Sequence, residues 1–217
     1  MGQSPAEAKQ LAKKLNLDVT DIRRLYHDLN GLDEMSLQEI VDLRAKAKHI
    51  FPDPKTYYYN TREEGFEQYY KRFAQWYMLR KELDLLDCGL MDPRNRVLTM
   101  AKYALDSGSM TLHYFAFIPA IEMLGNKEQR DYWVQKANRI EITGAYVQTE
   151  LGHGSDVMSL ETTATYDAAT KEFVINTPSL SATKFWPGGL GKTANHCVLY
   201  ARLISQGQDH GVNAFII

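Results

Sequence analysis

The stretch Tyr146–Asp156, YVQTELGHGSD, decides how the rest of the chain is interpreted. Residues that favour β-structure lead into a hydroxyl and an acid, and a Gly-His-Gly-Ser-Asp loop follows. This pattern predicts a strand that ends in a tight loop. Gly152 and Gly154 can take positive φ there and let another backbone or a flat ligand come close. Two interpretations stay open at this point: a ligand-binding loop, or a strand ending in a glycine turn that binds nothing.

The composition is that of an ordinary globular protein and excludes several function classes. Of the 217 residues, 44% are hydrophobic and 24% are charged. The 25 basic and 27 acidic residues give a net charge of −2, so the chain has neither a nucleic-acid footprint nor an acidic tail. Two cysteines, Cys88 and Cys197, argue against a disulfide scaffold, and no apolar run reaches the roughly 18–20 residues of a membrane span.

Residues 5 to about 140 carry the helical period of apolar positions. The predicted helices have recognisable starts at Pro5, Asp18 or Thr20, Ser36 with Glu39, Thr61 with Glu64, Asp92-Pro93, Ser109 and Asn126. The longest is expected to run from Thr61 to about Leu86, with an aromatic face that packs in the core. The nearly apolar stretch 109–124 predicts a buried helix that Pro119 kinks.

Near Ile142 the period of the apolar positions changes from 3.6 to 2. The predicted elements are a hairpin of strands 162–166 and 172–177, an extended run at 181–186, a long buried strand at 195–204, a turn at 205–211 and a strand from 212. This order predicts an α+β fold, with an all-helical N-terminal domain at 1–141 and an antiparallel β-domain at 142–217. No turn or cap follows the last strand, so we expect the chain to stop within this domain.

Several common catalytic sites are missing from the pattern. The six histidines are scattered and no cysteine pair has zinc spacing, so the sequence predicts no metal site. There is no Walker loop and no G-x-G-x-x-G motif, and the frame around Ser155 is not a nucleophile elbow. Glu150 and Asp156 have two interpretations, an acid–base pair or structural hydrogen-bonding groups. Their position beside a glycine loop favours the second.

A second segment, KFWPGG at 184–189, can complete a site with the first loop. If the two neighbour each other, they bring together the Thr149 hydroxyl, several glycine N–H groups and the Trp186 ring. A planar heterocycle with a polar edge needs this combination, because its face requires aromatic contact and its heteroatoms require fixed donors. Flavin fits that description, since its N5 and O4 accept hydrogen bonds. The alternative for Trp186 is an ordinary core residue.

Three separated motifs resemble one family. Residues 149–156, TELGHGSD, resemble the T-E-x-G-x-G-S-D flavin loop of the acyl-CoA dehydrogenase superfamily. Together with ETTAT at 161–165 and KFWPGGLGK at 184–192, they are more similar to the acyl-CoA oxidase branch. Dehydrogenases tend to have Pro and Ala where Leu151 and His153 stand.

The resemblance implies a fold and a reaction. The expected fold is a helical N-terminal domain, a central β-domain and a C-terminal helical region, with FAD between the β-domain and the helices. The expected reaction converts acyl-CoA to the trans-2-enoyl-CoA and passes the electrons to O₂, giving H₂O₂, in the peroxisome. No residue here matches the family's catalytic glutamate, which lies in the C-terminal helical region, so either this chain is part of a longer protein or a second chain completes the fold. The resemblance also implies a homodimer.

The resemblance also assigns roles to single residues. Thr149 would donate its hydroxyl to the polar edge of the flavin. Gly188 would let the backbone approach the ring, with Trp186 beside it. Three further residues would line the cofactor or the acyl-CoA: Gln148, Gly154 and Ser155. Of these, Ser155 is expected nearest the CoA.

Two alternatives to an oxidase remain open. A non-catalytic subunit could have kept the fold and lost the base, and it would then serve binding or assembly. A dehydrogenase that passes electrons to a protein acceptor is the third option, distinguished by slow reoxidation of its reduced flavin by O₂.

Overall fold

The computed structural model describes residues 37–50, 60–89, 92–105, 108 and 110–217. The predicted helices that begin near Pro5 and near Asp18 or Thr20 lie outside these residues, and so does the predicted cap Ser36. The helices are α3 (Leu37–Ala47), the 3₁₀ helix η1 (Lys48–Ile50), α4 (Arg62–Glu82), α5 (Pro93–Leu105), the π-helix η3 (His113–Phe117), α6 (Ile118–Leu124) and α7 (Lys127–Asn138).

The helix starts confirm three predicted caps. Thr61 and Glu64 form a complete capping box at the start of α4, and Asn126 forms one with Gln129 at the start of α7. Asp92 accepts the N–H groups at the start of α5. Each cap satisfies amide groups that have no partner inside the helix, which is why such short motifs can be recognised in the sequence.

The predicted end of the longest helix, near Leu86, is wrong by about a turn. α4 ends at Glu82, and Asp84 then takes a φ of 58°. The Leu85 N–H donates to the Arg80 carbonyl, and the Asp84 N–H donates to Lys81. This is a Schellman ending without the usual glycine, so the sequence carries no obvious stop signal there.

The predicted kink at Pro119 has a different form in the structure. Residues His113–Phe117 form a π-helix, and the Ile118 N–H closes its last turn on the His113 carbonyl. α6 then begins at Ile118, so Pro119 lies in its first turn, where a missing N–H has no cost. Most of the apolar stretch is buried, as expected, although Phe115, Met123 and Leu124 are exposed. It changes helix type before the proline instead of bending at it.

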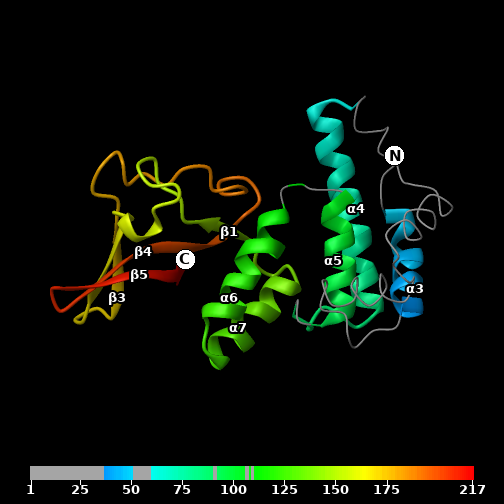
Figure 1. The fold of residues 1–217 in the computed structure, drawn as a ribbon, viewed down its shortest axis with the longest axis horizontal. Helices are drawn as coiled ribbons and strands as arrows, with labels where there is room; N and C mark the ends of the chain where they lie inside the picture. Colours follow the sequence, from blue (N-terminus) through cyan, green and yellow to red (C-terminus); the bar gives the residue numbers. More distant parts are fainter. Residues whose placement is uncertain (1–36, 51–59, 90–91, 106–107, 109) are drawn as a thin grey trace, which may run out of the picture.

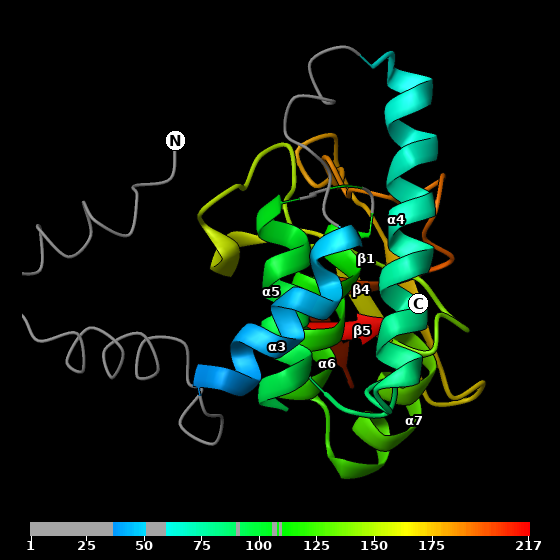
Figure 2. The ribbon, with the colours of Figure 1, turned by 90° about the vertical axis from the view of Figure 1, so that its right-hand side faces the viewer.

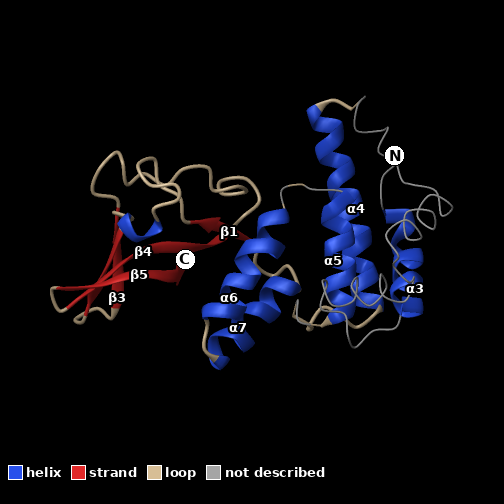
Figure 3. Cartoon of the chain, viewed as in Figure 1, coloured by secondary structure: helices blue, strands red, loops and turns tan. Residues whose placement is uncertain are grey.

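The strands are β1 (Gly144–Val147), β2 (Thr163–Asp167), β3 (Glu172–Asn176), β4 (His196–Ser205) and β5 (Gln208–Ile216), and a 3₁₀ turn, η4 (Val157–Ser159), precedes β2 (Figures 1 and 3). The α+β class is confirmed, but the sheet is mixed rather than antiparallel. The β2–β3 and β4–β5 hairpins are antiparallel, while β1 and β2 both run parallel to β4. The two strands pair with successive parts of β4, and the loop 148–162 lies between them.

Two further strand predictions need correction. The expected turn at 205–211 is only two residues long, because Gln206 and Gly207 both take positive φ, 52° and 74°. This geometry matches the twist of a tight hairpin, so β5 already begins at Gln208. The expected extended run at 181–186 is a loop whose only strand-like pairing among the described residues is a bridge between Glu150 and Lys184.

One apolar cluster joins the helices to the sheet. The rings of Tyr69, Phe73 and Trp76 from α4 are buried in it, which confirms the predicted core role for these residues of the aromatic face. Phe66, which was predicted on the same face, is exposed. Phe117 and Val198 extend the cluster to the π-helix and β4. Helices α6 and α7 lie between the sheet and the α4–α5 pair, and the view turned by 90° shows α3 at the far side of that pair (Figures 1 and 2). The domain division at residues 141 and 142 stays a prediction.

A bilayer crossing needs a long, nearly uncharged apolar helix, and the helices in the described part of the chain include none.

A buried histidine joins the helices to the first strand. The Gly144 N–H donates to His113 Nδ1 at 2.9 Å. The proton of the neutral ring is therefore on Nε2, which lies 3.0 Å from the Ala137 carbonyl at the end of α7. Burial lowers the pKa of His113 from its usual 6.5 to about 4, against the opposing effect of the Ala137 hydrogen bond.

This shift predicts a loss of stability in mild acid. The histidine of the unfolded chain takes up a proton below about pH 6.5, while the folded one stays neutral. The contribution of His113 to the free energy of unfolding is therefore complete above that pH and is lost as the pH falls towards 4. Between pH 7 and pH 5 the free energy of unfolding should fall by about 2 kcal/mol more in the native chain than in His113→Gln. Urea unfolding at the two pH values measures this, with the exposed His210→Gln as control. Equal pH dependence in the native chain and His113→Gln would contradict the assignment.

Candidate cofactor site

Two loops that are distant in sequence lie side by side beyond the end of β1. The Phe185 N–H donates to the Thr149 carbonyl at 3.0 Å, and the Leu151 N–H donates to Thr183 at 2.9 Å. The Gly152 N–H donates to the Ser181 carbonyl at 2.8 Å. The structure thus brings together residues 149–152 and 181–185, which is the juxtaposition that the sequence argument required.

The glycines of the first loop act differently from the prediction. Neither Gly152 nor Gly154 has positive φ, so that expectation is wrong. Gly152 is nevertheless a place of close backbone approach, because a Cβ there would lie 2.9 Å from the Ser181 Cβ. A Cβ on Gly154 would meet nothing within 4 Å among the described residues. In the second loop, positive φ occurs at Trp186 and Gly189, at 50° and 86°.

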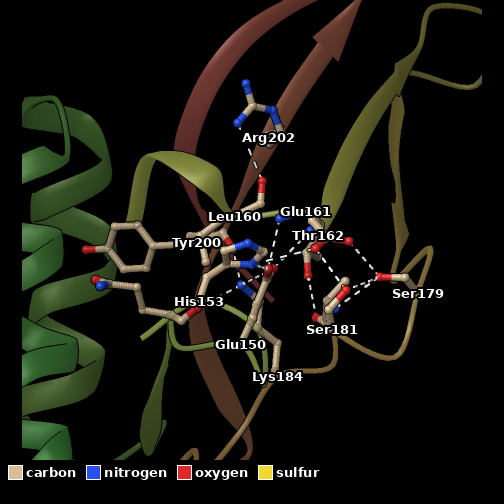
Figure 4. A network of polar contacts seen from close by, with 12 residues as sticks. Glu150, His153, Leu160, Glu161, Thr162, Ser179, Ser181, Lys184, Tyr200 and Arg202 are labelled. Atoms are coloured by element: carbon tan, nitrogen blue, oxygen red, sulfur yellow. Dashed lines mark hydrogen bonds and ion pairs between the residues drawn. The ribbon is translucent and has the colours of Figure 1, made fainter. Parts of the chain in front are cut away.

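The first loop is held by the buried carboxylate of Glu150 (Figure 4). It accepts the backbone N–H groups of Glu161 and Thr162 at 2.8 and 2.9 Å and lies 3.1 Å from the Lys184 ammonium. Burial alone would raise the pKa of Glu150, but these hydrogen bonds outweigh it and lower the pKa to about 2. An acid that stays ionised and is held by donors does not exchange protons, which supports the structural interpretation of Glu150.

A second polar cluster fixes the other loop (Figure 4). The Glu161 carboxylate accepts the Ser179 hydroxyl at 2.6 Å and the Ser181 hydroxyl at 2.9 Å. These hydrogen bonds lower the pKa of Glu161. His153 Nδ1 lies between the two acids, 3.3 Å from Glu150 and 3.7 Å from Glu161. The side chains around the two loops therefore form one connected polar network.

The predicted cofactor residues occupy the surface of this network. Gln148 and Thr149 are half-buried, and the Tyr146 hydroxyl donates to Gln148 Oε1 at 2.6 Å. Gly154 and Ser155 are exposed. No hydrogen bond or ring contact among the described residues joins these last two to the second loop.

Trp186 is exposed rather than a core residue. Its side chain is 74% exposed, and its ring stacks on Phe185 with centroids 6.1 Å apart and planes inclined by 22°. Gly188 lies over Leu112, the residue before the π-helix, since a Cβ at that glycine would be 2.6 Å from Leu112 Cδ1. A bulky residue at positive φ is strained, and such strain occurs at ligand sites more than elsewhere. The ring is thus presented to solvent by a constrained backbone.

Comparison with known proteins decides the family. The model of the acyl-coenzyme A oxidase N-terminal region matches residues 30–143, more than half of the chain. This chain belongs to the acyl-CoA oxidase family. Peroxisomal acyl-coenzyme A oxidase 1 of Rattus norvegicus is 38% identical over 199 residues, which cover 88% of the chain.

Solved acyl-CoA oxidases have the same arrangement of elements. Acyl-CoA oxidase 1 of Arabidopsis thaliana superposes with a TM-score of 0.67 at 39% identity, covering 82% of this chain and 27% of that one. Acyl-CoA oxidase-1 of Caenorhabditis elegans, complexed with FAD and ATP, gives 0.69 at 32% identity, covering 82% and 28%. The chain spans 28% of the length of the rat relative.

The predicted cofactor residues include an exposed aromatic ring and a hydroxyl group. The Trp186 ring lies open to solvent, and the Thr149 hydroxyl has no hydrogen-bond partner among the described residues. A half-buried donor beside an exposed aromatic ring suits a flat ligand with a polar edge.

A separate cavity lacks this combination of a polar donor and an exposed aromatic ring. It has a volume of about 410 Å³ between α6, α7 and the β4–β5 hairpin, and its lining includes Ile121, Trp133, Phe173 and Phe215. None of its lining residues comes from the two loops. Its walls are mainly apolar and offer few fixed donors, so we place the candidate cofactor site at the loops.

Sequence reasoning missed Lys184 as a member of the site. Its ammonium donates to the carbonyls of Gln148 and Tyr200 at 2.8 and 2.7 Å, and burial lowers its pKa. A lysine before two aromatic residues carries no local sign of such contacts. The only available signal was that Lys184 and Glu150 both fall within the quoted motifs.

Proposed function

We propose that this chain supplies the N-terminal region and part of the flavin-binding region of an FAD-dependent acyl-CoA oxidase. The complete protein would oxidise acyl-CoA to trans-2-enoyl-CoA and pass the electrons to O₂, giving H₂O₂, as a step of fatty acid β-oxidation in the peroxisome. One observation carries the proposal: the hydrogen-bonded pairing of the Thr149 loop with the Trp186 loop in a chain of this family. The FAD-complexed relative and the peroxisomal names of the curated relatives support it.

The residues of this chain would bind and orient the cofactor. Thr149 would donate its hydroxyl to the flavin edge, and Trp186 would contact the ring face. Gly188 would allow close approach of the backbone. The remaining lining positions would be Gln148, Gly154 and Ser155, with Ser155 nearest the CoA. FAD, when bound, would accept the hydride that leaves Cβ. We assign the base that removes the α proton to no residue of this chain.

An assembly role is the second candidate, and one observation favours it. β3 lies at the edge of the sheet, and Phe173, Val174 and Ile175 are all exposed on it. Exposed apolar edge strands are places where another chain can pair. The partner in this hypothesis is a second copy of the chain or a different chain that completes the fold. The hypothesis predicts stable association of the purified chain with that partner. A monodisperse monomer by light scattering would count against it.

A hydroxyl deletion tests the cofactor role. Titration of the purified chain into FAD should quench flavin fluorescence, and Thr149→Val should weaken binding about tenfold, the effect of one hydrogen bond. Thr165→Val, an exposed position on β2, is the matched control and should bind like the native chain. Equal affinities of the two variants would overturn the role of Thr149. Failure of the complete oxidase that carries this region to bind FAD would contradict the proposed function.

A further inference from the structure

The sheet has a gap between β1 and β2. β1 pairs with β4 as far as Leu199, and β2 pairs with β4 from Arg202. Tyr200 lies between these two pairings, and its carbonyl accepts the Lys184 ammonium at 2.7 Å. A side chain thus supplies a donor where neither neighbouring strand is in register, and it does so at the point where the first loop leaves the sheet.

The Lys184 ammonium uses all of its donors, two on the first loop and one on β4. Besides Tyr200 on β4, it donates to the carbonyl of Gln148 at 2.8 Å and lies 3.1 Å from Glu150 Oε1. An ammonium has three N–H groups, so these three acceptors saturate it. The Lys184 side chain is only 12% exposed and that of Glu150 is 0% exposed, so water competes little for these contacts.

The same contacts determine how the loop that carries Thr149 lies relative to the loop that carries Trp186. Gln148 immediately precedes Thr149, and Lys184 stands two residues before Trp186. Between them, the Phe185 N–H donates to the Thr149 carbonyl. The buried Lys184 ammonium therefore fixes both the backbone next to Thr149 and the backbone next to Trp186, although it contacts neither the Thr149 hydroxyl nor the Trp186 ring.

We propose that Lys184, with Glu150 as its counter-ion, is a positioning residue that fixes the distance between Thr149 and Trp186. Without the ammonium, the carbonyls of Gln148 and Tyr200 lose a donor, and the first loop shifts relative to the second. The ligand that this spacing fits, a flavin, rests on the proposed function. The spacing itself rests on the hydrogen bonds of this chain.

Three variants separate positioning from simple stabilisation. Lys184→Met keeps the length of the side chain and removes its charge. The double variant Glu150→Gln with Lys184→Met also removes the buried counter-charge, and neutral replacement of a buried ion pair often restores stability. Lys71→Met is the matched control, because Lys71 pairs with Glu67 on the exposed face of α4. Each is followed by thermal unfolding, amide hydrogen exchange, ¹⁹F NMR of 5-fluorotryptophan at position 186, and FAD titration.

We expect the double variant to recover stability but not the native position of Trp186. In Lys184→Met, amide exchange at Leu151 and Phe185 should rise about 100-fold, the Trp186 resonance should move, and FAD should bind about tenfold more weakly. The double variant should recover the melting temperature without recovering the native Trp186 resonance or the FAD affinity. Lys71→Met should match the native chain in every measurement.

Two outcomes would overturn the proposal. One is a double variant that recovers the Trp186 resonance together with the melting temperature, because Lys184 would then only stabilise the fold. The other is a Lys184→Met chain whose exchange and Trp186 resonance match those of Lys71→Met. If Lys184→Met does not fold, the double variant carries the comparison. A complete protein that binds no FAD would contradict the proposed function, while the exchange and ¹⁹F measurements on this chain still decide the positioning role.

Discussion

Replacing Arg80 with methionine should lower the free energy of unfolding by about 4 kcal/mol, because it leaves several buried acceptors without their donor. Arg80 is fully buried. Its Nε donates to Asn95 Oδ1 at 2.9 Å, and its Nη atoms donate to the Tyr114 hydroxyl, the Leu85 carbonyl and Asn138 Oδ1 at 3.1–3.2 Å. One guanidinium therefore joins α4, the start of α5, the π-helix and the end of α7.

The charge of Arg80 is compensated without an acid. Every partner that the described residues give this guanidinium is neutral, and its carbon lies 4.7 Å from the Trp76 ring centroid and 5.3 Å from that of Tyr114. Methionine fills a similar volume and cannot replace these contacts. Arg130→Met, at an exposed position on α7, is the matched control and should change stability by less than about 0.5 kcal/mol. Urea unfolding of both variants measures the difference, and a loss below about 1 kcal/mol in Arg80→Met would contradict this role.

The second large effect is expected from Gly144→Ala. A Cβ at Gly144 would lie 2.0 Å from Cγ of Phe117 and 2.2 Å from both ring Cδ atoms. Phe117 is fully buried and stacks on His113 at 5.6 Å, so its ring cannot move without disturbing the histidine that accepts the Gly144 N–H. Overpacking at this joint should lower the free energy of unfolding by about 3 kcal/mol.

A glycine on α4 provides the control for this substitution. Gly65 lies in the helix, and a Cβ there would meet nothing within 4 Å of the described residues. Gly65→Ala should therefore raise the free energy of unfolding by about 0.5 kcal/mol, because alanine favours helix and loses less entropy on folding. Chemical denaturation of both variants tests the contrast. Equal stability of the two variants would show that the Phe117 ring moves aside at no cost, and this would contradict the predicted overpacking.

Local signals in the sequence predicted the elements well, and non-local pairing was the part they could not predict. The capping boxes at Thr61 and Asn126 use residues three positions apart, so the sequence alone identifies them. The direction of β1 against β4 depends on how the chain returns over residues 148–195, which no local pattern records. The hairpin within residues 162–177 was predicted correctly, because a turn motif lies between its two strands. The predicted length of the β4–β5 turn was wrong, and the parallel pairs were missed.

In the candidate site too, the local motifs were recognisable in the sequence, while the side-chain contacts between distant segments were not predictable. The motifs around Thr149 and Trp186 were sufficient to predict that their loops meet. The exposure of Trp186 could not be predicted, because a lone tryptophan is more often buried. The Lys184–Glu150 pair was missed for a different reason: its contacts are to backbone carbonyls and amides from three separate segments, which carry no side-chain signature.

Amide NMR of the purified chain during FAD titration tests the flavin-loop claim most directly. We expect chemical-shift changes concentrated at Thr149, Trp186 and Gly188, with little change in the apolar cavity around Ile121 and Trp133. Changes centred on that cavity, with the two loops unaffected, would contradict a flavin site formed by the two loops.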